Sequence, residues 1–142
     1  MTPQLTATSS IIIKASPAKV WHALTDPETI KTYLFGTTTV TDWKVGSPIY
    51  FRDEWEGKSY EDKGVILEII PENILKYSYW SSMSGTEDKP ENFQVVSYLV
   101  KPNSGQTELT IIQEGSKSEE AKNHSEQNWK TIMDSIKTIM ES

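Results

Sequence analysis

The chain has 142 residues with a formal net charge of −6, and 36% of them are hydrophobic. These values are typical of a globular protein and argue against disorder, so we expect residues 1–142 to form one soluble domain. The acidic balance repels a phosphate backbone, and Arg52 is the only arginine. The composition therefore argues against nucleic-acid binding.

The sequence lacks the residues and motifs that disulfides, metal sites, nucleotide cofactors and membrane spans require. The chain has no cysteine, which rules out disulfides and thiolate metal sites. Its two histidines, His22 and His124, have no metal-binding spacing, and no dinucleotide or phosphate-loop motif occurs, so we expect no metal and no cofactor. The longest aliphatic run, 11–13, is far shorter than the ~20 residues that cross a bilayer. Without a signal peptide, these features predict a cytoplasmic protein with no stable membrane insertion.

The first third of the chain predicts a strand followed by two short helices. Residues 5–14 are rich in β-branched side chains, which favour a strand. Ser16-Pro17 and Asp26-Pro27 each place a capping residue before a proline suited to the first helical position. They predict helices over 17–24 and from 27 to about 34.

From residue 37 onward the hydrophobic pattern alternates. It predicts strands over 37–43, 49–55, 59–70, 74–80, 93–101 and 107–114, separated by turns. Gly64 predicts a bulge in the third of them. The polar segment 81–92 is expected to be a mobile loop. Residues 118–140 carry apolar side chains at three- and four-residue steps and predict one long amphipathic helix.

Strands in succession with helices at the two ends indicate an α+β protein rather than a doubly wound parallel sheet. We expect a curved antiparallel β-sheet of about six to seven strands that grips one long C-terminal α-helix, with the two short helices after the first strand. A sheet that curves around a helix encloses a groove, and such grooves are common ligand sites.

Specific local sequences also point to a known family. They are the segment 15–27, Trp43-Lys44-Val45-Gly46, the segments 63–71, 75–77 and 107–111, and His124 with Trp129. In this order they resemble the START-like (SRPBCC, helix-grip) superfamily, and within it the family of homologues of the activator of the heat-shock protein 90 ATPase. The chain departs from the usual pattern at Asn128, where glycine is common, and at Gly46-Ser47, where two glycines are frequent.

The resemblance implies a helix-grip fold but several functions. Members of the superfamily bind lipids, hormones and polyketides, some are cyclases or hydrolases, and fold alone does not decide among these. The family's name by itself does not predict that this chain activates a chaperone, and a co-chaperone-like interaction module stays open as an alternative.

Aromatic residues are the main functional signal in the sequence, because several fall on strand faces expected to point inward. A few polar residues are placed to orient a ligand. The predicted cavity consists of Phe51, Asp53, Trp55, Tyr77, Tyr79, Tyr98, Gln113, His124, Trp129 and Met133, and its rim of Leu34 and Phe35.

The resulting hypothesis is that a small apolar or amphipathic molecule binds in a cavity between sheet and C-terminal helix, with no assigned catalytic residue. One alternative is a cavity enzyme of cyclase or hydrolase type that uses His124 or Asp53. The other is a protein-interaction module with a filled core, whose partner is another protein or a second copy of the chain. An exposed patch of Trp43, Tyr50 and Trp80 would favour this second alternative.

Overall fold

The computed structural model describes residues 5–34, 36–81, 86–116 and 118–141, without the side chain of Trp55. The strands are β1 (Leu5–Ile13), β2 (Thr38–Val40), β3 (Pro48–Trp55), β4 (Lys58–Ile70), β5 (Ile74–Tyr79), β6 (Gln94–Asn103) and β7 (Gln106–Ser116). The helices are α1 (Pro17–Thr25), α2 (Pro27–Tyr33) and α3 (Glu119–Glu141), with a 3-10 turn, η1 (Pro90–Asn92). The predicted α+β architecture is confirmed.

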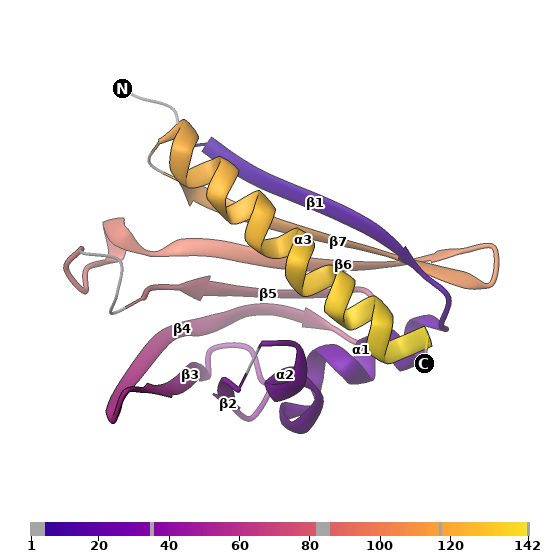
Figure 1. Ribbon diagram of the computed structural model, residues 1–142, viewed down its shortest axis with the longest axis horizontal. Helices are drawn as coiled ribbons and strands as arrows, with labels where there is room; N and C mark the ends of the chain where they lie inside the picture. Colours follow the sequence, from indigo (N-terminus) through magenta and orange to yellow (C-terminus); the bar gives the residue numbers. More distant parts are fainter. Residues whose placement is uncertain (1–4, 35, 82–85, 117, 142) are drawn as a thin grey trace.

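The strands form one antiparallel sheet in the order β1-β7-β6-β5-β4-β3-β2. Strands adjacent in sequence from β2 to β7 are adjacent in the sheet, and β1 joins the far edge beside β7. Figure 1 shows α3 running diagonally across one face of the bent sheet, with α1 and α2 near its C-terminal end. The N-terminal half of α3 is thus left to face the strands directly.

Both short helices begin at the predicted caps. The Ser16 hydroxyl accepts a hydrogen bond from the backbone N–H of Lys19, at 3.3 Å. The Asp26 carboxylate accepts from the backbone N–H and the hydroxyl of Thr29, at 3.3 and 2.6 Å. These bonds lower the pKa of Asp26, the hydroxyl of Thr29 having the largest effect. Local sequence therefore fixes this V-shaped connection, as expected for capped helix starts.

The strand predicted over 37–43 is much shorter in the structure, where β2 contains only Thr38–Val40. The backbone leaves the extended conformation at Trp43, whose φ is +61°. The Asp42 carboxylate accepts a hydrogen bond from the N–H of Lys44, at 3.1 Å. This local bond favours a turn over further pairing with β3.

The bulge predicted at Gly64 was misplaced. Lys63 pairs with Trp80 and Ile66 with Tyr77 in one unbroken register, and the shift comes after Ile66. Gly64 has a different role: a Cβ there would lie 1.6 Å from the backbone oxygen of Ser78. The glycine is needed because β5 approaches β4 too closely for a side chain.

The core lies on the face of the sheet that the helices cover. Inward side chains of the strands, including Ile66, Leu75 and Ile111, form one cluster with Val20 and Ile136 of the helices. On the opposite face, large apolar side chains such as Val65 and Leu67 are 40% and 43% exposed. The alternation expected from sequence therefore separates a covered face from an uncovered one.

The free edge of β1 is protected by side chains of α3. The Glu141 carboxylate accepts a hydrogen bond from the N–H of Lys14 at 2.9 Å, and the Lys137 ammonium donates to the carbonyl of Ile12 at 3.0 Å. The bond from Lys137, with that from Lys14, holds the pKa of Glu141 below its ordinary value. Such blocking of edge groups disfavours pairing with another chain through β1.

Across the residues that the structure describes, every helix is too short or too polar to span a lipid bilayer.

Candidate ligand pocket

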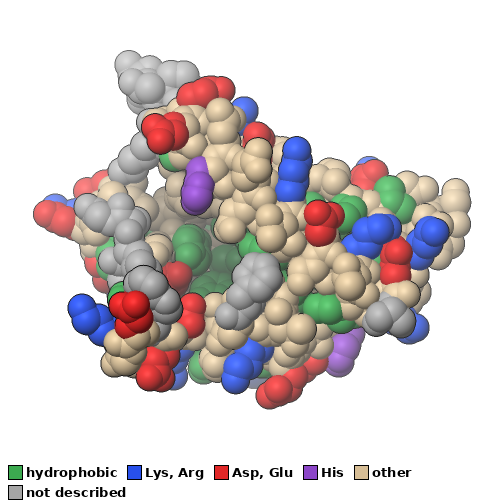
Figure 2. Space-filling model, in the orientation of Figure 1, with side chains coloured by type: hydrophobic (Ala, Val, Ile, Leu, Met, Phe, Trp, Pro, Cys, Tyr) green, Lys and Arg blue, Asp and Glu red, His purple; other side chains and the backbone are tan. Residues whose placement is uncertain are grey.

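A pocket of about 310 Å³ lies between the N-terminal half of α3 and the middle strands of the sheet. Figure 2 shows the hollow with hydrophobic side chains on its floor. It is lined by Leu34, Thr37, Phe51, Asp62, Tyr77, Tyr79, Val96, Tyr98, Gln113, His124, Ser125, Asn128, Trp129 and Ile132. The strands supply its floor and α3 supplies one wall.

Aromatic rings form a continuous wall along this pocket. Phe51 contacts Tyr77 and Tyr79, with ring centroids 5.5 and 5.9 Å apart. Tyr77 meets Tyr98 edge to face, and Tyr98 meets Trp129 in the same way, each pair at 5.9 Å. These separations are within the favourable range for aromatic pairs. These rings therefore form one packed row that runs from Phe51 on β3, across the floor of the pocket, to Trp129 on α3.

Two of these tyrosines share a buried hydrogen bond. The hydroxyl oxygens of Tyr77 and Tyr98 are 3.0 Å apart, and both side chains are buried. Burial raises the pKa of Tyr98 to about 12 and that of Tyr77 well above its ordinary value. Both hydroxyls thus stay protonated at neutral pH, and one donates a hydrogen bond to the other within the apolar floor of the pocket.

A series of side-chain hydrogen bonds connects α3 to the sheet. The indole N–H of Trp129 donates to the side-chain oxygen of Gln113, at 2.8 Å. The amide nitrogen of Gln113 in turn donates to the side-chain oxygen of Gln94. The Gln94 amide donates to the carbonyl of Gly115, at 3.2 Å. This chain of amides fixes the Trp129 ring as a wall of the pocket.

The pocket also contains a carboxylate. Asp62 lies opposite Phe51 in the β3–β4 register, and so on the inward face. Its Oδ2 accepts a hydrogen bond from the hydroxyl of Tyr79, at 2.7 Å. Burial, followed by the negative charge of Asp62, raises the pKa of Tyr79. The phenol therefore remains a donor to Asp62 at neutral pH.

The structure brings most of the expected cavity residues together. Phe51, Tyr77, Tyr79, Tyr98, Gln113, His124, Trp129 and the expected rim residue Leu34 all line the pocket. Met133 is 2% exposed and lies in the core instead. Phe35 and the side chain of Trp55 lie outside the described residues.

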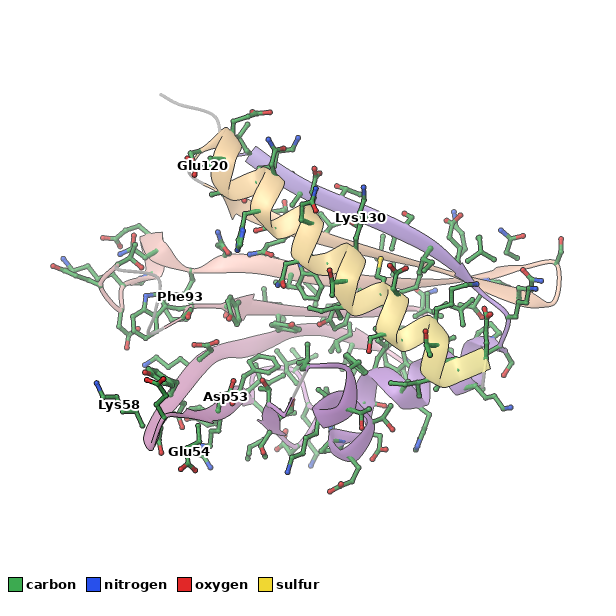
Figure 3. All side chains as sticks on the ribbon, viewed as in Figure 1. Asp53, Glu54, Lys58, Phe93, Glu120 and Lys130 are labelled. Atoms are coloured by element: carbon green, nitrogen blue, oxygen red, sulfur yellow. The ribbon has the colours of Figure 1, made fainter. Side chains whose placement is uncertain are left out.

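Asp53 is placed on a different surface. Its side chain is exposed, and it lines a separate surface depression of about 510 Å³ with charged residues that include Arg52, Glu54 and Glu61. Figure 3 labels Asp53 and Glu54 on β3, close to the hairpin where Lys58 begins β4. Asp53 is two residues after Phe51 and therefore on the same face of β3, as expected. It lies outside the pocket because this end of β3 extends beyond it.

Sequence reasoning missed Asp62, Ser125 and Asn128. Asp62 pairs with Phe51 across β3 and β4, and this register is what places it on the inward face. Ser125 lies four residues before Trp129, and Asn128 lies four residues before Ile132, so helical spacing puts each on the same side of α3 as its partner. Asn128 is also one of the two places at which the chain departs from the pattern of the family it resembles.

No cluster of three or more His, Asp or Glu side chains suited to a metal ion occurs among the residues that the structure describes. Within the same residues, His124 and Asp62 are the titratable groups of the pocket other than tyrosine. The chemistry that the pocket offers is thus an aromatic surface with hydroxyl, amide, imidazole and carboxylate groups at its margins.

This fold and pocket define a START-like helix-grip protein. The profile of the family described as "Activator of Hsp90 ATPase homolog 1-like protein" matches residues 14–141, and the chain belongs to that family. No match was found among curated proteins.

Solved structures agree with this assignment. The chain is 42% identical to ChR145 from Cytophaga hutchinsonii, with a TM-score of 0.88 over 99% of this chain and 97% of that one. It is 20% identical to MLL2253 from Mesorhizobium loti, with a TM-score of 0.79 over 96% and 97% of the two chains. It is 19% identical to Aha1 from Colwellia psychrerythraea, a protein described as a dimer, with a TM-score of 0.74 over 96% of each chain. The last two show likeness of fold alone.

Proposed function

We propose that the protein binds a small apolar or amphipathic molecule in the pocket between α3 and the sheet. The observation that carries this proposal is the pocket of about 310 Å³, whose aromatic wall is interrupted by a few polar groups. That volume is within the range of small-molecule sites, and apolar walls with few polar groups are typical of them. Each Å² of apolar ligand surface removed from water contributes roughly 25 cal/mol.

Native mass spectrometry of gently purified protein tests whether the chain carries such a molecule. An added mass that disappears in a denatured control would support the proposal and identify the ligand. Binding is tested independently with the neutral apolar dye Nile red, whose fluorescence rises on leaving water, and with a panel of lipids, polyketides and aromatic amphiphiles.

Replacing Ser125 with tryptophan should block the pocket. Ser125 is half-buried and lines the pocket from α3, so a bulky side chain there would occupy ligand volume. We expect Nile red affinity to fall at least about tenfold. The control is Gln127→Trp, because Gln127 is exposed on the same helix and does not line the pocket. Equal affinity of both variants and the wild type would contradict binding in this pocket.

The uncovered face of the sheet supports a second candidate, a protein-interaction surface. Tyr50 and Trp80 lie on either side of Lys63 in one cross-strand row, beside the exposed Val65 and Leu67. Trp43, also expected there, packs against the core instead. Such apolar surface suits a protein partner or a second copy of the chain. Colwellia Aha1, which shares the fold, is described as a dimer. A bare chain in mass spectrometry with no binding across the panel would favour this candidate.

The enzyme alternative now depends on His124, because Asp53 does not share its pocket. The carboxylate that lines the same pocket as His124 is Asp62.

A cytoplasmic location remains a prediction.

A further inference from the structure

We infer that Asp62 selects the polar end of the ligand, so that the pocket favours molecules carrying a protonated amine over those carrying a carboxylate. This inference rests on the proposed function and adds the chemical class of the ligand. It depends on where Asp62 lies, on its partners, and on the charges of the other pocket residues.

Position is the first argument. Asp62 is half-buried, pairs with Phe51 across β3 and β4, and lines the pocket. Its sequence neighbours Glu61 and Lys63 point to the opposite face, since adjacent side chains on a strand alternate. A ligand that contacts the Phe51 and Tyr79 rings therefore lies beside this carboxylate.

The partners of Asp62 give the second argument. A carboxylate has about four acceptor sites, and the hydroxyl of Tyr79 uses one, at 2.7 Å. Two basic residues on β3 and β4 pair elsewhere: Arg52 with Glu61 at 2.7 Å, and Lys63, the sequence neighbour of Asp62, with Asp88. Within the described part of the chain, no lysine, arginine or histidine forms an ion pair with Asp62. Among the described residues its charge thus has a hydroxyl donor but no paired cation, and a ligand ammonium would supply one.

The rest of the lining gives the third argument. Among the described residues His124 is the one basic side chain that lines the pocket, and no lysine or arginine there offers a fatty-acid or other carboxylate head group a permanent positive charge. The net charge of −6 acts in the same direction at longer range. An ammonium would instead meet Asp62 and the faces of the neighbouring aromatic rings, both of which attract cations.

Three compounds with one hydrophobic body test this inference: naphthylethylamine, naphthylethanol and naphthylacetate. Their affinities for wild-type protein are measured by calorimetry, and we expect the order amine, alcohol, acid. In Asp62→Asn the amine should lose roughly tenfold in affinity, while the alcohol changes little. The acid should bind more tightly to this variant than to wild type, because a repulsive charge has gone.

Asp53→Asn is the matched control. It removes the same charge from the adjacent strand, at an exposed position outside the pocket, and should leave all three affinities unchanged. Equal loss of amine binding in both variants would show a general charge effect and overturn the inference. Asp62→Asn keeps side-chain size, and its thermal unfolding checks that the fold is retained.

The outcomes separate this inference from the proposed function. If the alcohol binds and the amine binds no better, or the acid binds best, the selection by Asp62 is wrong while ligand binding stands. If none of the three binds wild-type protein, the inference also fails. In that case the affinity of wild-type protein and of Ser125→Trp for Nile red decides whether the pocket binds a ligand at all.

Discussion

Replacing Gly64 with alanine is expected to lower the free energy of unfolding by roughly 3 kcal/mol or more. The added Cβ would lie 1.6 Å from the backbone oxygen of Ser78 and 2.5 Å from its carbonyl carbon. Backbone atoms cannot rotate away as a side chain does, so β4 and β5 must separate. This separation would weaken the pairing that holds Asp62 beside Tyr79.

Urea denaturation of Gly64→Ala beside Val65→Ala measures this effect. Val65 is the next residue on the same strand, faces the uncovered side of the sheet, and is 40% exposed, so its truncation should change stability by about 0.5 kcal/mol or less. A loss below about 1 kcal/mol for Gly64→Ala would contradict the close approach of the two strands.

Trp129→Ala should also be strongly destabilising, by about 3 to 5 kcal/mol. The variant removes the ring that packs edge to face on Tyr98 at 5.9 Å, and the donor to Gln113 at 2.8 Å. It also removes one wall of the pocket, so Nile red affinity should fall with stability. Both losses come from the contact between α3 and the sheet.

Trp129→Phe separates packing from hydrogen bonding. Phenylalanine keeps most of the ring contact with Tyr98 but leaves the Gln113 oxygen without its indole donor, which should cost about 1 to 2 kcal/mol. Unfolding curves for the two variants give the comparison. Equal stability of Trp129→Phe and Trp129→Ala would show that ring packing at this position contributes little.

The fold was largely predictable because its signals are local and repeated. Capping at Ser16 and Asp26 determined both helix starts, and alternation determined which faces of the long strands are buried. The misplaced bulge shows where a tertiary contact decided the outcome. Gly64 was expected at a bulge, whereas it accommodates the backbone of Ser78, which no local pattern reveals.

The pocket was predictable in its aromatic part and less so in its polar part. Tyr77, Tyr79 and Trp129 follow from alternation and helical spacing, which the sequence displays. The choice between Asp53 and Asp62 required knowing the pairing of β3 with β4 and where the strands extend past α3. Those are properties of register and strand length, and sequence patterns constrain them only weakly.

The most direct test of the account is chemical-shift mapping by NMR with the neutral probe naphthylethanol. Binding in the pocket predicts that the perturbed signals cluster at Asp62, Tyr79 and Trp129, which line the pocket from three different elements. Saturable shifts confined to Val65 and Leu67, on the uncovered face, would contradict the account and move the binding surface to the other side of the sheet.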